Sequence, residues 1–400
     1  MTKTETRRTD DGRLSTLGRE GAHRHLTPRL SKGRFWRRRR VVAWILIAIF
    51  TIVPYLRVHG RPLLLLDIVH RRFTIFGHVF LPTDTFLLAL LLIGLVLTVF
   101  WVTALVGRIW CGWACPQTVY LEFVYRPLER LFSGTAGRGG RPRRPLTGWR
   151  QFGMYASYLL VSMFLAHTFL AYFVGVDNLL HWVRRSPLEH PLSFLVMAAT
   201  TGAMMFDFVY FREQLCVILC PYGRLQSTLL DKGSLVIGYD ALRGEPRGKL
   251  RRERTEGGAK LLPTLSHQGD CIDCRKCVTT CPTGIDIRDG LQLECIGCAQ
   301  CIDACDAVMD KIGKPRGLVR YDFQARFEGE PVRLLRPRVV IYPILIAIIA
   351  ALFFSTLRSK EYADIFVQRN LGTPFAVLPD GEVANSVQIK ITNRTDAPVS

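Results

Sequence analysis

Apolar residues in this chain are gathered into blocks of about 20, separated by basic stretches that contain Gly and Pro. A helix needs about 20 consecutive apolar residues to cross the hydrocarbon core of a bilayer. The pattern therefore predicts a polytopic membrane protein with soluble parts, not one globular core. We expect five spans, over residues 41–56, 85–106, 154–174, 191–211 and 339–356.

The spans divide the chain into a basic tail, a four-span membrane region, a soluble segment, a last span and a β segment. These cover residues 1–40, 41–230, 231–337, 338–357 and 358–400, respectively. The β segment is predicted from alternating apolar and polar residues, as in 386–391. One or two strands are not stable alone, so we expect only the start of a β domain here.

The chain carries 53 Lys and Arg against 33 Asp and Glu, a net charge of +20. In a soluble protein this excess would suggest nucleic acid as a partner. Here the basic residues gather in alternate loops, the positive-inside pattern of membrane insertion, so nucleic acid is not expected. The tail, which ends in four arginines at 37–40, and the 107–150 loop are the richest. This orientation places the N-terminus, the 107–150 loop and the soluble segment in the cytoplasm and the C-terminal strands outside.

Eight of the twelve cysteines fall into two runs with the spacing C-x2-C-x2-C-x3-C. This is the bacterial ferredoxin spacing for cubane iron–sulfur clusters, in which the fourth cysteine of each run ligates the other cluster. We therefore expect an inserted two-cluster ferredoxin domain holding two [4Fe-4S] clusters. The ligands of the first cluster are assigned to Cys271, Cys274, Cys277 and Cys305. The ligands of the second cluster are assigned to Cys295, Cys298, Cys301 and Cys281.

A pair of zinc ribbons is the alternative for these runs. Zinc ribbons usually use two separated C-x2-C pairs, whereas each run here places four cysteines within eleven residues. One departure from the ferredoxin pattern is that Pro282 follows the first run but Asp306 follows the second. Proline is not a ligand, so its absence after the second run affects packing and leaves the cluster assignment unchanged.

The remaining four cysteines form two C-x3-C-P motifs, each following a predicted span, at Cys111, Cys115, Cys216 and Cys220. The first and second spans form one hairpin, and the third and fourth spans form another. Because each hairpin ends in this motif, we infer a parallel repeat about an axis along the membrane normal. On a helix, cysteines four apart share one face, and we expect the following proline to end that helix. Two such pairs can form a four-sulfur site for Cu(I), zinc or an iron–sulfur cluster. Four buried structural cysteines are the alternative.

Histidines are weaker candidates for a site. His167 lies within the third predicted span, where an ionisable residue is either functional or a neutral, hydrogen-bonded core residue. The residues between the first two spans include His59, His70 and His78, whose spacing matches no ligand pattern. We interpret that stretch as a solvated or interfacial loop.

Four strings resemble the family of the cytochrome c oxidase accessory protein CcoG, also called FixG or RdxA. They are LDIVHRRFTIFG (66–77), GRIWCGWACPQT (107–118), CPYGRLQS (220–227) and YDALRGEP (239–246). The resemblance covers roughly residues 32–400. It implies a bacterial inner-membrane protein that assists assembly of cbb-type haem–copper oxidases, with copper as substrate or cargo. It also implies a role for the C-x3-C-P cysteines in copper handling, oxidase assembly factors or a copper transporter as partners, and a C-terminal immunoglobulin-like domain.

The function expected from these features is electron transfer through two cubane clusters to copper held at the C-x3-C-P cysteines, which would make the protein a cupric reductase. Two alternatives stay open. One is a copper chaperone whose clusters are structural. The other is a quinol-oxidising electron-transfer subunit of a respiratory chain. No nucleotide or flavin fingerprint identifies an electron donor, because no G-x-G-x-x-G follows a predicted strand.

Overall fold

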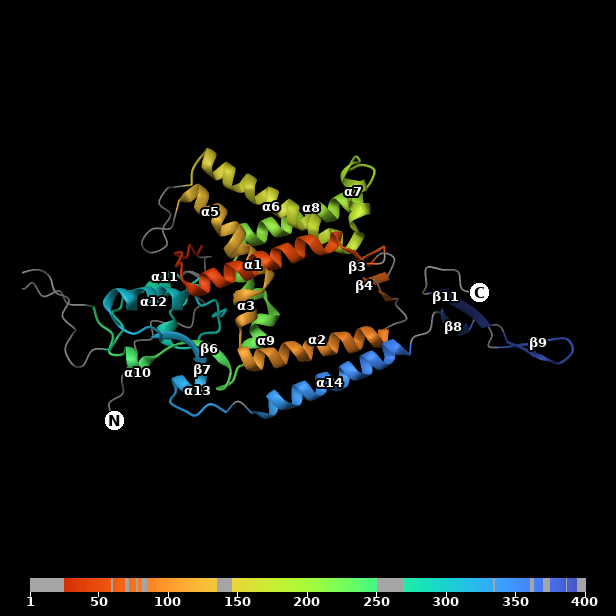
Figure 1. Cartoon of the computed structure of the whole chain (residues 1–400). Helices are drawn as coiled ribbons and strands as arrows, with labels where there is room; N and C mark the ends of the chain where they lie inside the picture. Colours follow the sequence, from red (N-terminus) through yellow and green to blue (C-terminus); the bar gives the residue numbers. More distant parts are fainter. Residues whose placement is uncertain are drawn as a thin grey trace, which may run out of the picture.

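The structure is a computed structural model and describes residues 25–58, 60–68, 72–76, 78–80, 85–134, 146–249, 269–333, 335–359, 363–369, 375–385 and 387–393. Its long helices run roughly lengthwise across Figure 1. The cysteine runs lie at one end of these helices, around α12 (Gln300–Ile312). The strands β8 (Ala363–Arg369) and β11 (Val387–Asn393) lie at the opposite end. Soluble parts therefore lie at both ends of the apolar helices.

Four helices in the described part of the chain are long and apolar enough to cross a membrane. They are α2 (Thr85–Val106), α6 (Trp149–Val174), α8 with the π-helical turn that follows it (Pro191–Phe211), and α14 (Pro337–Arg358). The sequence predicted all four, although α6 and α14 extend slightly beyond the expected bounds. Most of their side chains face outward, as is required of surfaces that contact lipid.

The first predicted span coincides with α1 (Arg34–Ile52). Its first two turns carry five arginines, so its apolar part is shorter than a bilayer requires. The fifth span therefore stays a prediction. α1 packs against α6, where the Tyr172 hydroxyl donates to the Phe50 carbonyl oxygen at 2.7 Å, while α2 lies along α14 (Figure 1).

The stretch between α1 and α2 is not the loop that we expected. It contains two short strands, β1 (Arg57–Val58) and β2 (Arg61–Pro62), and a three-stranded antiparallel sheet. The strands of that sheet are β3 (Leu64–Asp67), β4 (Arg72–Ile75) and β5 (His78–Phe80). Hydrogen bonds between these strands satisfy a backbone that packs against α6. His59 and His70 lie outside the described residues, so a metal role for the histidines of this stretch stays untested.

Strand structure at the C-terminus is confirmed. β8 pairs antiparallel with β11, with Val367 opposite Ile389, and β9 (Ala376–Val377) pairs with β10 (Val383–Ala384). β8 begins at Ala363, well before residues 386–391, whose alternating apolar and polar residues predicted the β segment. An immunoglobulin-like domain stays an expectation.

The soluble segment is closed by its first and last strands. β6 (Leu235–Tyr239) pairs antiparallel with β7 (Val319–Phe323), and both cysteine runs lie between them in sequence. Two helices continue from within the runs, α11 (Lys276–Thr279) and α12. Buried side chains from the strands and α12, such as Ile237 and Ile302, form its core together with cysteines of both runs.

Candidate iron–sulfur and membrane-edge cysteine sites

The structure brings the four cysteines assigned to each cluster together around a separate cavity. One cavity is lined by Cys271, Cys274, Cys277 and Cys305. The other is lined by Cys281, Cys295, Cys298 and Cys301, with Cys277 also at its edge. Each cavity thus receives three cysteines from one run and the last cysteine from the other. This is the juxtaposition that crossed ligation requires, although the ligand assignment itself stays a prediction.

Both runs adopt the same backbone conformation at equivalent positions. Asp273 and Gly297 have φ of 48° and 67°, and Arg275 and Ala299 have φ of 52° and 61°. Non-glycine residues rarely adopt the left-handed region, so three of them at matched positions mark a constrained loop. Arg275 and Ala299 each directly precede a helix, α11 and α12. Each run therefore wraps its cavity with two left-handed turns before the chain enters a helix.

The two clusters' surroundings differ in exposure. Cys274 is exposed, so the first cavity reaches the surface of the soluble segment. Cys298 and Cys301 are buried, on the side of the soluble segment that contacts the membrane region. An electron entering near Cys274 would therefore reach the second cavity before the membrane region.

The C-x3-C-P motifs do not form the continuous helical faces that the sequence predicted. Cys111 lies in the short helix α3 (Ile109–Trp113), but Cys115 is extended and is the N-cap of α4 (Pro116–Tyr120). Cys216 lies in a π-helical turn at Leu215–Leu219, and Cys220 is the extended N-cap of α9 (Pro221–Leu229). Each proline begins a helix as well as ending one, because its fixed φ suits the first helical position. The equivalent breaks at Cys115 and Cys220 agree with a repeat of the two hairpins.

The fold nevertheless makes the four cysteines of the two motifs neighbours. Cys216 lies near enough to the other three cysteines that a negative charge on any of them would raise its pKa. Gln117 joins the two hairpins, since its Nε2 donates to Asp207 Oδ1 at 3.1 Å and to the Arg212 carbonyl at 3.0 Å. Cys111 Sγ donates to Gln226 Oε1 at 3.0 Å.

Burial raises the pKa of Cys111 to about 11 and that of Cys216 to about 12, so both thiols are protonated at neutral pH. A metal bound here would displace these protons. Among the residues that the structure describes, no three His, Cys, Asp or Glu side chains lie close enough to hold one metal ion. A four-sulfur site therefore stays a prediction.

The first C-x3-C-P motif packs directly on the loop of the second cavity. Cys111 forms a buried apolar cluster with Ile296 and Cys298. A Cβ added to Gly112 would lie 2.6 Å from the Ile296 carbonyl oxygen and 2.8 Å from Cys298 Cα. Trp113 Nε1 donates to the Tyr321 hydroxyl at 3.1 Å, and that hydroxyl donates to the Gly297 carbonyl. Only glycine allows this approach at position 112.

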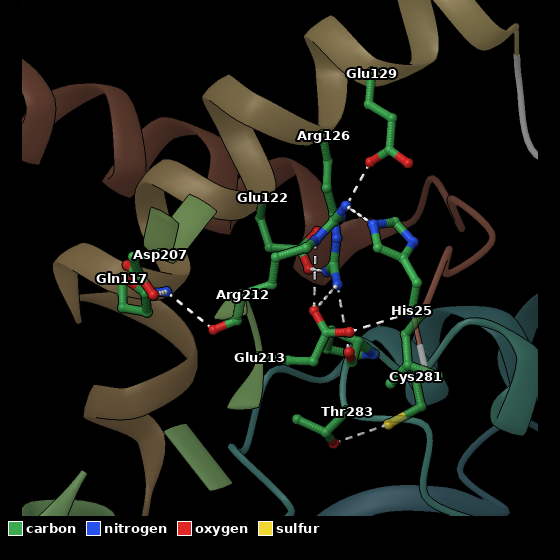
Figure 2. Close-up of polar contacts among 12 residues, drawn as sticks. His25, Gln117, Glu122, Arg126, Glu129, Asp207, Arg212, Glu213, Cys281 and Thr283 are labelled. Atoms are coloured by element: carbon green, nitrogen blue, oxygen red, sulfur yellow. Dashed lines mark hydrogen bonds and ion pairs between the residues drawn. The ribbon is translucent and has the colours of Figure 1, made fainter. Parts of the chain in front are cut away.

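A network of buried ion pairs joins the membrane region to the chain next to Cys281, at the second cysteine cavity (Figure 2). Arg126 pairs with Glu122 and, through Nη2, with Glu213 at 3.3 Å, and all three side chains are buried. The same Nη2 lies 3.4 Å from the carbonyl oxygen of Pro282, the residue after Cys281. Arg212 pairs with Glu129 at 3.0 Å. The network ties the two hairpins to the second cysteine cavity.

His167 is half-buried in α6, and its Nδ1 is 2.7 Å from the Met163 carbonyl oxygen one turn earlier. This local bond satisfies one ring nitrogen, and both interpretations of His167, functional and structural, stay open. Sequence reasoning missed Gly112 and Gln226 as contributors to the site. Gly112 could have been suspected from its place between two ligand-type cysteines, whereas nothing local to Gln226 indicates its contact with Cys111.

Two domain matches agree with this architecture. Residues 211–324 match a 4Fe-4S dicluster domain, and residues 88–135, which include Cys111 and Cys115, match a 4Fe-4S binding domain. The fold, the paired cysteine cavities and these matches define a membrane protein that carries iron–sulfur clusters and transfers electrons.

Relatives that match over most of their length identify the family. The chain is 36% identical to Protein RdxB and 33% identical to Protein RdxA of Cereibacter sphaeroides, and 31% identical to the nitrogen fixation protein FixG of Rhizobium meliloti. Each match covers 92% of this chain and 77–79% of the relative. The chain belongs to the FixG/RdxA/CcoG family. No solved structure matches it.

Proposed function

We propose that this protein passes electrons from its two [4Fe-4S] clusters to copper held at Cys111, Cys115, Cys216 and Cys220, reducing Cu(II) to Cu(I) for assembly of a cbb-type haem–copper oxidase. The observation that carries the proposal is the contact of Gly112 with Cys298, which joins a C-x3-C-P motif to the second cavity without intervening side chains. Cys111, the neighbour of Gly112, packs on the same loop.

The proposed step transfers one electron. A [4Fe-4S] cluster held by Cys281, Cys295, Cys298 and Cys301 would supply that electron, and in giving it up would convert one Cu(II) to Cu(I). Soft thiolate ligands stabilise Cu(I) and so favour acceptance of the electron. The path supported by the contacts begins near exposed Cys274, passes from the first to the second cluster, and ends at Cys111.

The proposal includes a location in the bacterial inner membrane with five spans. Lys and Arg are concentrated in the tail and in the 107–150 loop, which favours a cytoplasmic position for the motifs and clusters. Reporters fused after Gly140 or Gly258 are expected to read as cytoplasmic, and one fused after Leu371 as periplasmic. A periplasmic signal at Gly140 would reverse the orientation. Oxidase assembly factors or a copper transporter are the proposed partners.

The decisive assay is anaerobic, with bound copper and Cu(I) measured on chemically reduced protein. Replacing all four C-x3-C-P cysteines with Ala should abolish copper binding and leave both clusters in place. Replacing Cys271 or Cys295 with Ala should leave copper bound and stop its reduction. His181→Ala, at an exposed histidine remote from the motifs, controls for adventitious copper and should change neither result.

Three outcomes would contradict the proposal. Wild-type copper reduction by the four-cysteine variant would make the motifs structural. Copper that binds but stays Cu(II) on protein with reduced clusters would indicate a carrier. Quinol oxidation by the purified protein, without copper reduction, would indicate a respiratory electron-transfer subunit.

A further inference from the structure

One of the four consecutive arginines at the start of α1 differs from the others. Arg37, Arg38 and Arg40 are exposed, whereas Arg39 is 0% exposed. Successive helical residues are about 100° apart, so one position in such a run faces inward, as Ala43 does one turn later. A positive-inside signal needs no buried arginine, so Arg39 requires another explanation.

The buried guanidinium of Arg39 is only partly paired. Its Nε donates to the Gly112 carbonyl oxygen at 2.8 Å, and its Cζ lies 5.5 Å from the centre of the Phe123 ring. Stacking on a ring face leaves the in-plane N–H groups unsatisfied. Both Nη1 and Nη2 are buried and have no hydrogen-bond partner among the described residues. Unpaired buried donors on a charged group are costly, so a missing partner of opposite charge is indicated.

The second cysteine cavity is the adjacent candidate for that partner. The Gly112 carbonyl oxygen accepts the hydrogen bond from Arg39 Nε, and a Cβ added to Gly112 would lie 2.8 Å from Cys298 Cα. Arg39 is thus one hydrogen bond and one close backbone contact away from Cys298, which is assigned to the second cluster. A cubane cluster bound by four thiolates is anionic, and its sulfurs accept hydrogen bonds.

The buried arginine beside the first cavity is already neutralised. Arg288 lines that cavity and lies 2.6 Å from both Asp273 and Asp286. Arg39 thus lies close to the second cavity with free buried donors, whereas Arg288 lines the first cavity with two carboxylate partners.

We propose that Arg39 donates Nη1 and Nη2 to sulfurs of the second cluster and thereby raises its reduction potential above that of the first. A reduced cluster carries one more negative charge, so a cation and two N–H donors stabilise the reduced form. Electrons would then flow from the first cluster to the second, toward Cys111. This inference rests on the electron path of the proposed function, but its test needs no copper.

The test is a redox titration of the anaerobically purified full chain, followed by electron paramagnetic resonance. A Cys271→Ala background isolates the second cluster's signal. Arg39→Met should lower the reduced-to-oxidised ratio of that cluster at least tenfold at a fixed potential, which is 59 mV for a one-electron couple. Arg39→Lys keeps the charge but loses the planar fork and should shift it less. Arg40→Met, at the exposed neighbour stacked on Trp36, should shift nothing.

An unchanged potential in loaded Arg39→Met protein would overturn the inference. If that variant fails to retain the second cluster, Arg39→Lys decides, because a loaded lysine variant with the wild-type potential would also overturn it. Failure of the proposed function is distinguishable. A protein that shows the Arg39 shift but reduces no copper keeps this inference and loses the copper proposal.

Discussion

The side chain of Asp303 caps the N-terminus of α1, although Asp303 lies more than half the chain length away from α1 in sequence. Its Oδ2 accepts a hydrogen bond from the Trp36 backbone N–H at 2.7 Å, and its Oδ1 accepts one from Phe35 at 3.1 Å. Gly33 leaves room for this carboxylate, because a Cβ there would lie 2.3 Å from Asp303 Cγ. Asp303 stands between Cys301 and Cys305, so the cap fixes the second cysteine run to α1.

Asp303→Ala should loosen this junction. Loss of an N-cap carboxylate costs about 1–2 kcal/mol, partly through the helix dipole. We expect a lower unfolding midpoint when iron–sulfur absorbance is followed during heating. Asp310→Ala, at an exposed residue of α12 whose partner is Arg316, is the matched control and should have a much smaller effect. Equal losses in the two variants would refute the capping role.

The sequence predicted the features that depend on local pattern. Four spans were located because long apolar runs have few alternatives in a membrane, and the cysteine spacing alone grouped the residues around each cavity. It did not predict the break at Cys115, where proline starts a helix, or the sheet in which β3 lies. The Asp303 cap and the approach of Gly112 to Cys298 join residues far apart in sequence. No local periodicity encodes such contacts, so they required the structure.

Cys305→Ala should remove the first cluster and spare the second. The reason is that Cys305, although it is the last cysteine of the second run, lines the cavity of Cys271, Cys274 and Cys277. About half of the bound iron and sulfide should be lost. Electron paramagnetic resonance of the reduced protein checks which signal disappears, with Cys281→Ala as the reciprocal variant. Selective loss of the cluster held by Cys295 in the Cys305 variant would contradict crossed ligation.

Gly112→Ala should separate the membrane-edge motif from the second cluster. The added methyl group meets backbone atoms of Ile296 and Cys298, which cannot rotate away, and overpacking of this kind costs about 1–3 kcal/mol. Single-turnover transfer from reduced clusters to copper should slow, with both clusters and copper binding retained. Gly202→Ala is the control, because a Cβ at that helical glycine meets nothing within 4 Å. An unchanged transfer rate in the Gly112 variant would show that the path does not cross this contact.

Arg126→Ala should destabilise the junction between the hairpins and the second cavity. Burial lowers the pKa of Arg126 to about 10, so it is still charged at neutral pH and neutralises buried Glu122 and Glu213. Removing one partner of a buried pair costs about 3–5 kcal/mol, because the remaining charge is left uncompensated. The bond to the Pro282 carbonyl is lost as well, so the second cluster's spectrum should broaden before the first cluster's changes. Arg185→Ala breaks an exposed pair with Glu189 and should cost less than about 1 kcal/mol in the same thermal unfolding measurement. If both arginine variants unfold together, or if the first cluster is the one disturbed, the network does not support the second cavity.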